Sequence, residues 1–315
     1  MTYFFFVLGF YALIKGADLM IDGASAFAKR FGVSSLVIGL TVVAFGTSAP
    51  ELIVSILASL KGHNELAIGN IIGSNIANVF LILGLSAIFT PLIVKKQTVL
   101  KEIPFAILAI VLLAVFVNDT AISHASENML SRSEGFALLS FFGVFVYYTF
   151  GIAKHGTEKN EVASLSLSKS MLYFVLGCIG LALGGQWIVD GAVLIAKNFG
   201  MSEGLIGLTI VAIGTSLPEL AASIIAAKVG ETDLAVGNII GSNIFNIFLV
   251  LGVNASIQNI PFQEKMNGDV LVAVFSILLL FIFVLMSSKH KLYRWQGGVF
   301  VLLYVVYIGY LVFRG

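Results

Sequence analysis

Hydrophobic residues gather in long runs along this chain, and short polar segments separate one run from the next. A helix of about 20 apolar residues is long enough to cross the roughly 30 Å hydrocarbon core of a membrane. Runs of this kind cover approximately residues 3–28, 35–60, 66–93, 100–118, 132–153, 170–196, 203–228, 233–257, 269–287 and 294–313. The pattern predicts an all-α integral membrane protein with ten transmembrane helices.

Composition agrees with a protein that lies mostly within a lipid bilayer. The chain is 58% hydrophobic and 11% charged, whereas soluble domains carry roughly 25% charged residues. The net charge of +1 says nothing about a nucleic-acid partner, and no basic patch suggests one, so none is expected. The first run lacks the basic start and cleavage site of a signal peptide, so it is predicted to be a spanning helix. The single cysteine, Cys178, is expected to be a small buried hydrophobic residue.

Residues 36–85 and 204–253 are two copies of one sequence, separated by a constant 168 residues. The copies are identical at 31 of 50 aligned positions and share the segments GTSxPEL and GNIIGSNI. Because the repeat holds five spans, an odd number, the second copy must enter the membrane from the opposite side. The chain is therefore predicted to form two inverted-topology five-helix repeats, residues 1–153 and 170–315, joined by a linker at 154–169.

Basic residues are distributed unequally between the two sets of predicted loops. The side that holds the 154–169 linker carries twelve Lys and Arg residues, and the side that holds the termini carries five. The positive-inside bias places the linker in the cytoplasm and both termini outside, in a plasma membrane or bacterial inner membrane. The linker is too short for a dedicated calcium-sensing domain, so no regulation of that kind is expected.

Two carboxylates, Glu51 and Glu219, lie in the middle of spans at equivalent positions of the two copies. An ionised carboxylate at the bilayer centre costs at least about 2.5–3.5 kcal/mol. Spans 2, 3, 7 and 8 hold no Lys, Arg or His away from their ends, which disfavours an internal salt bridge. A bound cation would offset the cost. The alternative is that each glutamate is protonated and hydrogen-bonded as a structural pin.

A proline stands directly before each glutamate, and it lacks the N–H that would bond the carbonyl four residues earlier. Each helix is expected to kink or unwind at these places, within Gly46–Pro50 and Gly214–Pro218. Such a break could free backbone carbonyls, including those of Ala44 and Ala212. Irregular backbone at this depth is tolerated only where it is buried in protein or lines a watery cavity.

Polar side chains surround each glutamate at helical spacing. Thr47 and Ser48 precede Glu51 by four and three residues, so the three side chains share one helix face. The second copy repeats this arrangement with Thr215, Ser216 and Glu219. The next spans carry polar residues four apart that could face the site from a second helix, namely Ser74, Asn78, Ser242 and Asn246. A single Ser or Thr more often bonds its own helix, but the symmetric set favours a shared site.

The residue types indicate the class of ligand. Carboxylate, carbonyl, hydroxyl and amide oxygens without Cys or His suit hard cations such as Ca²⁺ and Na⁺. Two carboxylates match the charge of one divalent ion, and Mg²⁺ is disfavoured because it gives up its waters reluctantly. A site that holds either one divalent ion or several sodium ions would produce exchange by competition. No cofactor is expected apart from the transported ions, and no nucleophile–base pair suggests an enzyme.

The paired stretches GTSAPEL…GNIIGSNIAN and GTSLPEL…GNIIGSNIFN resemble the two alpha-repeats of the sodium/calcium exchanger branch of the cation/calcium exchanger superfamily. The resemblance covers essentially the whole chain. It implies a core of spans 2, 3, 7 and 8 around the ions, and tilted spans 1 and 6 that slide across this core during alternating access. The implied calcium ligands are Thr47, Glu51, Thr215 and Glu219, with Asn78 and Asn246 as the remaining polar ligands of the centre. The implied sodium ligands include the same threonines and glutamates. The full set is Ala44, Thr47, Ser48, Glu51, Ser74, Ala212, Thr215, Ser216, Glu219 and Ser242.

Differences from relatives narrow the choice of the ion that is coupled to calcium transport. Potassium-dependent exchangers are among the relatives that carry Asp where this chain has Asn246, which weakens the case for potassium co-transport. Proton-coupled relatives usually differ in the GTSxPE segment, and both copies here retain Thr and Ser. The prediction is an electrogenic sodium/calcium antiporter that extrudes calcium and needs only a monomer. Calcium/proton exchange, potassium-dependent exchange and a passive cation channel are the alternatives.

Two further carboxylates, Asp22 and Asp190, repeat near the ends of spans 1 and 6. They could attract cations into a vestibule or contact a gate. The favoured interpretation is a hydrogen bond at a helix end.

Overall fold

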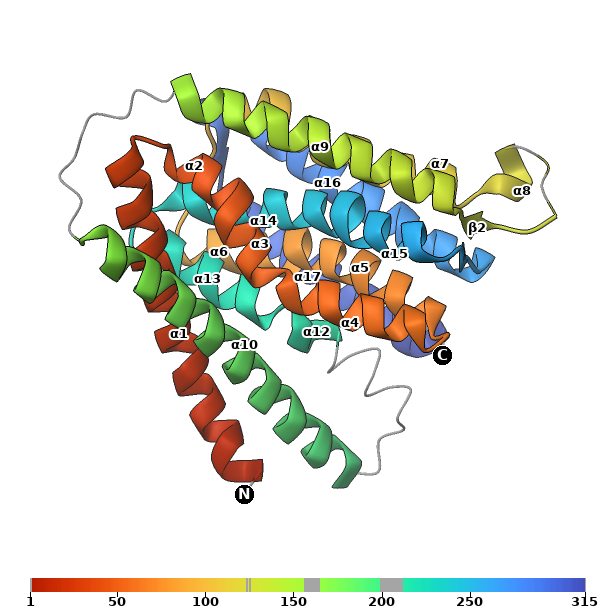
Figure 1. Cartoon of the computed structure of the whole chain (residues 1–315), viewed down its shortest axis with the longest axis horizontal. Helices are drawn as coiled ribbons and strands as arrows, with labels where there is room; N and C mark the ends of the chain where they lie inside the picture. Colours follow the sequence, from red (N-terminus) through yellow and green to blue (C-terminus); the bar gives the residue numbers. More distant parts are fainter. Residues whose placement is uncertain (1, 123, 125, 156–164, 199–211, 315) are drawn as a thin grey trace.

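The computed structural model describes residues 2–122, 124, 126–155, 165–198 and 212–314. The chain is built from long helices (Figure 1). The helices of the first half are α1 Thr2–Phe31, α2 Ser35–Ile38, α3 Ala44–Thr47, α4 Ala49–Leu60, α5 Asn64–Ile76, α6 Gly84–Phe89, α7 Ile103–Phe116, α8 Asp119–Ile122 and α9 Arg132–His155. Those of the second half are α10 Leu167–Asn198, α12 Ala212–Thr215, α13 Leu217–Lys228, α14 Thr232–Ile244, α15 Gly252–Ile257, α16 Asn267–Met286 and α17 Arg294–Arg314.

Shorter elements lie between these helices in the described part of the chain. Wide-turned π-helical segments interrupt or precede the α-helices, namely η1 Gly39–Val43, η2 Ala77–Leu83, η3 Thr98–Glu102 and η5 Phe245–Leu251. Single turns of 3₁₀ helix are η6 Glu264–Met266 and η7 Ser288–His290. The strands are β1 Leu92–Ile93, β2 Met129–Leu130, β3 Ile260–Pro261 and β4 Lys291–Leu292.

The chain is a helical membrane protein. Within the described residues, eight helices are long and apolar enough to cross a membrane, and a bent pair of segments, Ser35–Thr47 and Ala49–Leu60, is a ninth candidate. The predicted span at 203–228 begins outside the described residues. Helices also extend into both ends of the predicted 154–169 linker, because α9 continues to His155 and α10 begins at Leu167.

Two of the spans form the centre of the bundle. In Asn64–Phe89 and Thr232–Ile257, 78% and 94% of the most apolar stretch is buried, against 22–39% in the other six complete spans of the described residues. These two segments carry Gly, Ser and Asn residues along their length, as in GNIIGSNI. Amide and hydroxyl groups in contact with lipid would lack hydrogen-bond partners, so these helices are stable only when other helices surround them.

Helices α1 and α10 lie side by side and are inclined to the rest of the bundle (Figure 1). Their backbones touch through glycines. A Cβ atom on Gly16 would lie 2.7 Å from the backbone nitrogen of Leu181, and one on Gly177 would overlap the backbone nitrogen of Met20. Small residues at such positions allow close packing of helices inside a membrane, where no hydrophobic effect drives them together.

Short strand pairs link loops of the first half to loops of the second. Strand β1 pairs antiparallel with β4, with Leu92 opposite Leu292, and β2 pairs antiparallel with β3, with Met129 opposite Pro261. These pairs satisfy backbone groups at the helix ends, and they tie the two halves together at both ends of the bundle.

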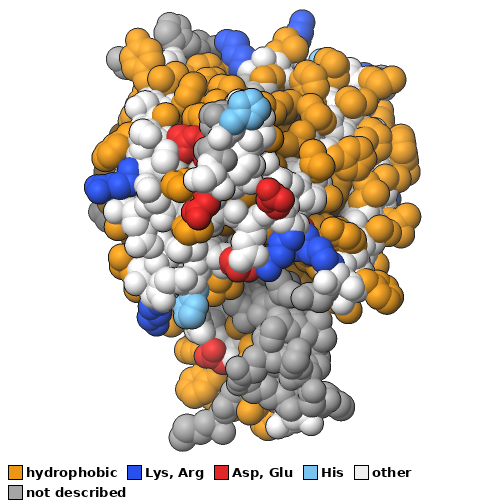
Figure 2. Space-filling model, turned by 90° about the vertical axis from the view of Figure 1, so that its right-hand side faces the viewer, with side chains coloured by type: hydrophobic (Ala, Val, Ile, Leu, Met, Phe, Trp, Pro, Cys, Tyr) orange, Lys and Arg blue, Asp and Glu red, His pale blue; other side chains and the backbone are white. Residues whose placement is uncertain are grey.

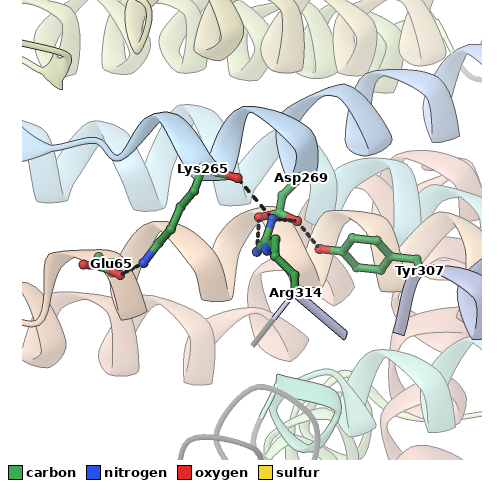
Figure 3. A network of polar contacts seen from close by, with 5 residues as sticks. All are labelled: Glu65, Lys265, Asp269, Tyr307 and Arg314. Carbon is green, nitrogen blue, oxygen red and sulfur yellow. Dashed lines mark hydrogen bonds and ion pairs between the residues drawn. The ribbon is translucent and has the colours of Figure 1, made fainter. Parts of the chain in front are cut away.

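Ion pairs reinforce the same connections. The Arg314 guanidinium contacts Asp269 through two nitrogens at 3.1 and 2.9 Å, and the Tyr307 hydroxyl donates to the same carboxylate at 3.1 Å (Figure 3). Arg314 also donates to the Lys265 carbonyl, and the Lys265 ammonium lies 3.1 Å from Glu65 of the first half. A related pair, Lys95 to Asp233 at 2.8 Å, joins a loop of the first half to the start of α14.

The surface shows where lipid and water meet the molecule. Figure 2 shows the end of the bundle that lies at the right of Figure 1. Charged side chains gather at the centre of this end, and hydrophobic side chains gather around its margins. Such a distribution is expected where helices emerge from a membrane, because their sides contact lipid and their ends contact water.

Candidate functional site

Both helices that carry the predicted glutamates are broken. The segment Ser35–Thr47 ends before Ser48, which has φ −87° and ψ 3°, and α4 continues at an angle of 44°. Ser216 separates α12 from α13 with nearly the same dihedral angles, φ −89° and ψ 5°. Each break falls two residues before a proline, where one helical hydrogen bond is lost. The repeated sequence thus forms the same broken helix twice.

Glu51 and Glu219 each lie in the first turn of the helix that follows a break, and both have no exposed surface. The first amides of a helix carry partial positive charge, which favours a carboxylate at this position. Within the described residues, no Lys, Arg or His is observed in an ion pair or a hydrogen bond with either glutamate. The site therefore gathers two acidic groups without a basic partner.

Serines from each half reach the other half. The Ser48 hydroxyl lies 2.9 Å from Glu219 Oε1 and 2.9 Å from the Ser242 hydroxyl. The symmetric contact joins Ser216 to Ser74 at 3.2 Å, and Ser74 lies 3.5 Å from Glu51 Oε1. The two broken helices therefore meet in one polar site with the two central helices.

The threonines are held by asparagines that the sequence analysis did not single out. Thr47 donates to Asn238 Oδ1 at 3.1 Å, and Thr215 donates to Asn70 Oδ1 at 3.2 Å. Asn238 and Asn70 in turn donate to serines of the broken helices, Ser223 at 3.0 Å and Ser55 at 3.4 Å. All four of these supporting residues belong to the repeat at the same 168-residue spacing, and that signal could have identified them.

Two further asparagines, Asn75 and Asn243, orient the predicted central amides. Asn78 donates to Asn243 Oδ1 at 2.9 Å, and Asn246 donates to Asn75 Oδ1 at 3.0 Å. Asn78 and Asn246 both lie at the start of a π-helical segment, η2 or η5. Segments of this kind are rare and occur frequently at functional sites. With both amide nitrogens engaged, the amide oxygens remain to accept a bond or bind a ligand.

Four buried oxygens at the centre of this network lack a hydrogen-bond partner among the described residues. They are Glu51 Oε2, Glu219 Oε2, Asn78 Oδ1 and Asn246 Oδ1, and none of the four residues has exposed surface. Buried polar atoms are nearly always paired, so this symmetric group of four acceptors is available to a proton or to a cation. Carboxylate and amide oxygens without nitrogen or sulphur ligands suit a hard cation such as Ca²⁺ or Na⁺.

The carbonyl of Ala44 differs from expectation. It accepts from the Ser48 amide at 2.9 Å, and the Thr47 hydroxyl lies 3.3 Å away, so the break does not free this carbonyl in this structure. The reason is that the last turn before Ser48 stays closed, and the chain bends only afterwards. In the second half, Ala212 begins α12, and the Ser216 amide bonds to Ile213 O at 3.2 Å.

An open cavity of about 590 Å³ reaches the site from one side. Its walls come from the two broken helices and from α10, and they include Pro50, Thr215, Pro218 and Asp190. Thr215 is half-buried, whereas its counterpart Thr47 has no exposed surface. The site is therefore approached from the α10 side in this structure. Asp190 also accepts a hydrogen bond from Gln186 of its own helix at 2.8 Å.

Broken helices from two related halves that enclose a buried polar site are typical of secondary transporters. Comparison with known proteins agrees. Residues 1–151 and 169–313 match the family model described as sodium/calcium exchanger protein. The chain belongs to this family of membrane transporters.

Individual relatives match over most of their length. The sodium/calcium exchanger MaX1 of Methanosarcina acetivorans is 32% identical, with 96% of each chain covered. The inner membrane protein YrbG of Escherichia coli is 39% identical over 80% of this chain and 78% of its own. A structure of the sodium-calcium exchanger NCX_Mj soaked with Na⁺ and Sr²⁺ superposes with a TM-score of 0.84 at 38% identity, over 98% of this chain and 97% of the other.

Proposed function

We propose that this protein exchanges Na⁺ for Ca²⁺ across the membrane by alternating access. The observation that carries the proposal is the group of four unpaired oxygens on Glu51, Glu219, Asn78 and Asn246. A Ca²⁺ ion bound there would neutralise the two carboxylates, and the Thr47 and Thr215 hydroxyls are proposed as further oxygen ligands. Family membership and the names of MaX1 and NCX_Mj support the choice of ions.

Competition supplies the coupling. The serine pairs Ser48–Ser242 and Ser74–Ser216 flank the carboxylates on both sides. Sodium ions between these hydroxyls and the same two glutamates would use charges that Ca²⁺ also needs. One site therefore holds calcium or several sodium ions in turn. Exchange of more than two Na⁺ per Ca²⁺ moves net charge, so the transport is proposed to be electrogenic.

Contacts between loops support the proposed ten-helix inverted topology. The loops that β1 and β4 occupy are separated by six predicted spans, and those of β2 and β3 by four. An even number of spans puts both members of each pair on the same face of the membrane. Lys95 and Asp233, and likewise Lys265 and Glu65, also join segments predicted to share a face. We propose that both termini lie outside, in a plasma membrane.

The cavity supports access to the site from one side in this conformation. It reaches Thr215 but not the enclosed Thr47, its counterpart in the first half. Movement of the closely packed pair α1 and α10 across the broken helices would close this cavity and open its symmetric counterpart. The face at which α10 ends is predicted to be external, so we assign this conformation to an outward-facing form.

Calcium uptake into sodium-loaded vesicles tests the coupling ion. We expect rapid calcium-45 uptake that stops when choline replaces the sodium, because the large organic cation does not fit between the serine hydroxyls. The control is a vesicle with an imposed proton gradient and no sodium. Uptake that persists there would favour calcium/proton exchange, uptake that needs potassium as well would favour the potassium-dependent alternative, and single-channel currents would favour a channel.

A further inference from the structure

Asp190 occupies a distinctive place in the open cavity. The cavity lies between α10 and the two broken helices, and its described lining includes Pro50, Pro218 and Thr215, which belong to the broken helices around the buried site. Asp190 lines the same space and is exposed, in contrast with the enclosed carboxylates Glu51 and Glu219. An ion that entered the site through this cavity would come close to the Asp190 carboxylate.

The walls around Asp190 strengthen the attraction of its carboxylate for cations. Among the described residues that line the cavity, Asp190 is the one with a charged side chain, and most of the others are Ala, Gly, Pro, Val or Leu. Apolar walls have a low dielectric constant and concentrate the field of a nearby charge, which raises the local concentration of counter-ions and their rate of binding. Gln186 donates to Asp190 Oδ1 at 2.8 Å and fixes the side chain.

The repeat mate of Asp190 is placed differently. Asp22, 168 residues earlier on α1, is exposed as well, but it does not line this cavity. The threonines of the two halves differ in the same way, because Thr215 is half-buried and Thr47 is enclosed. Each aspartate is therefore assigned to the access route of its own half, and the cavity seen among the described residues belongs to the second half.

We propose that Asp190 recruits cations at the face where α10 ends and passes them to the buried site, without binding them there, and that Asp22 has this role at the opposite face. The inference rests on the proposed ion exchange. In this proposal each aspartate captures ions at its own face of the membrane. Its charge lowers the half-saturating ion concentration at that face and leaves the maximal transport rate unchanged.

The test measures calcium uptake with a sided assay in oriented vesicles. Asp190→Asn is expected to raise the half-saturating Ca²⁺ concentration by about three- to tenfold at the α10-end face only, as electrostatic focusing predicts. Asp22→Asn should do so at the other face only. The difference between wild type and Asp190→Asn should shrink in about 1 M choline chloride, where the Debye length falls to roughly 3 Å. Asp190→Glu, which keeps the charge, should behave like wild type.

Glu127→Gln is the matched control, because it removes an exposed carboxylate from a loop predicted to lie on the same face and outside the cavity lining. It should leave the Ca²⁺ dependence unchanged. Equal half-saturation for wild type and Asp190→Asn, an effect on both faces, or an effect that salt does not reduce would overturn the inference. Failure of wild-type vesicles to couple calcium to sodium would instead overturn the proposed function.

Discussion

Replacing Glu51 or Glu219 with glutamine is expected to abolish calcium-for-sodium exchange. Each variant keeps the size of the side chain but removes half of the negative charge of a site that has no exposed surface. Loss of one charged partner from a buried ionic site costs about 3–5 kcal/mol. Since a factor of ten in affinity corresponds to about 1.4 kcal/mol, calcium binding should weaken by about 100-fold or more.

The measurement is calcium-45 uptake into sodium-loaded vesicles, normalised to the amount of inserted protein. Glu65→Gln is the matched control: the Glu65 side chain is 52% exposed, and its ion-pair partner Lys265 in Figure 3 is 59% exposed. Exposed ion pairs contribute little, about 0–1 kcal/mol. The control should therefore transport normally. Near-normal exchange in either Glu51→Gln or Glu219→Gln would refute the assignment of the site.

Replacing Gly177 with alanine is expected to slow transport strongly while calcium binding persists. The added Cβ would lie 2.6 Å from Met20 Cβ and 2.7 Å from Gly16 O, so α1 and α10 could not keep their present separation. Overpacking of this kind costs about 1–3 kcal/mol. If that cost falls on the movement of the two helices past the core, the rate drops by about five- to 150-fold.

Gly143→Ala on α9 provides the comparison, because a Cβ there meets no atom of the described residues within 4 Å. Exchange rates of both variants should be measured beside equilibrium calcium binding. A wild-type rate in Gly177→Ala would show that close packing of α1 and α10 is not required for access. If Gly177→Ala lost calcium binding and transport together, the substitution would have disrupted the folded site and not the movement of the helices.

The repeat made much of the site predictable. Duplicated carboxylates after prolines are costly in a membrane, so the sequence alone, with glutamates at positions 51 and 219, already indicates a ligand. The breaks at Ser48 and Ser216 fall within the predicted segments. Helix positions were also accessible to prediction, because apolar length and polar loops largely determine where a span begins and ends.

Other features depend on tertiary contacts that one sequence cannot specify. The roles of Asn70 and Asn238 arise only when each meets a threonine of the opposite half. The π-helical turns at Asn78 and Asn246 carry no distinct composition. The Ala44 carbonyl stays bonded because the Ser48 amide still reaches it, and the helix breaks at Ser48 itself. Access from one side is a property of the conformation, and two similar repeats cannot reveal which route is open.

Equilibrium binding of calcium-45 to the purified protein in detergent tests most directly whether one mirrored pair of glutamates holds competing ions. The expected result is one Ca²⁺ per chain, displaced by Na⁺ with a dependence steeper than first order, and lost in Glu51→Gln. Calcium binding that sodium does not displace, or that survives unchanged in Glu51→Gln, would contradict the account.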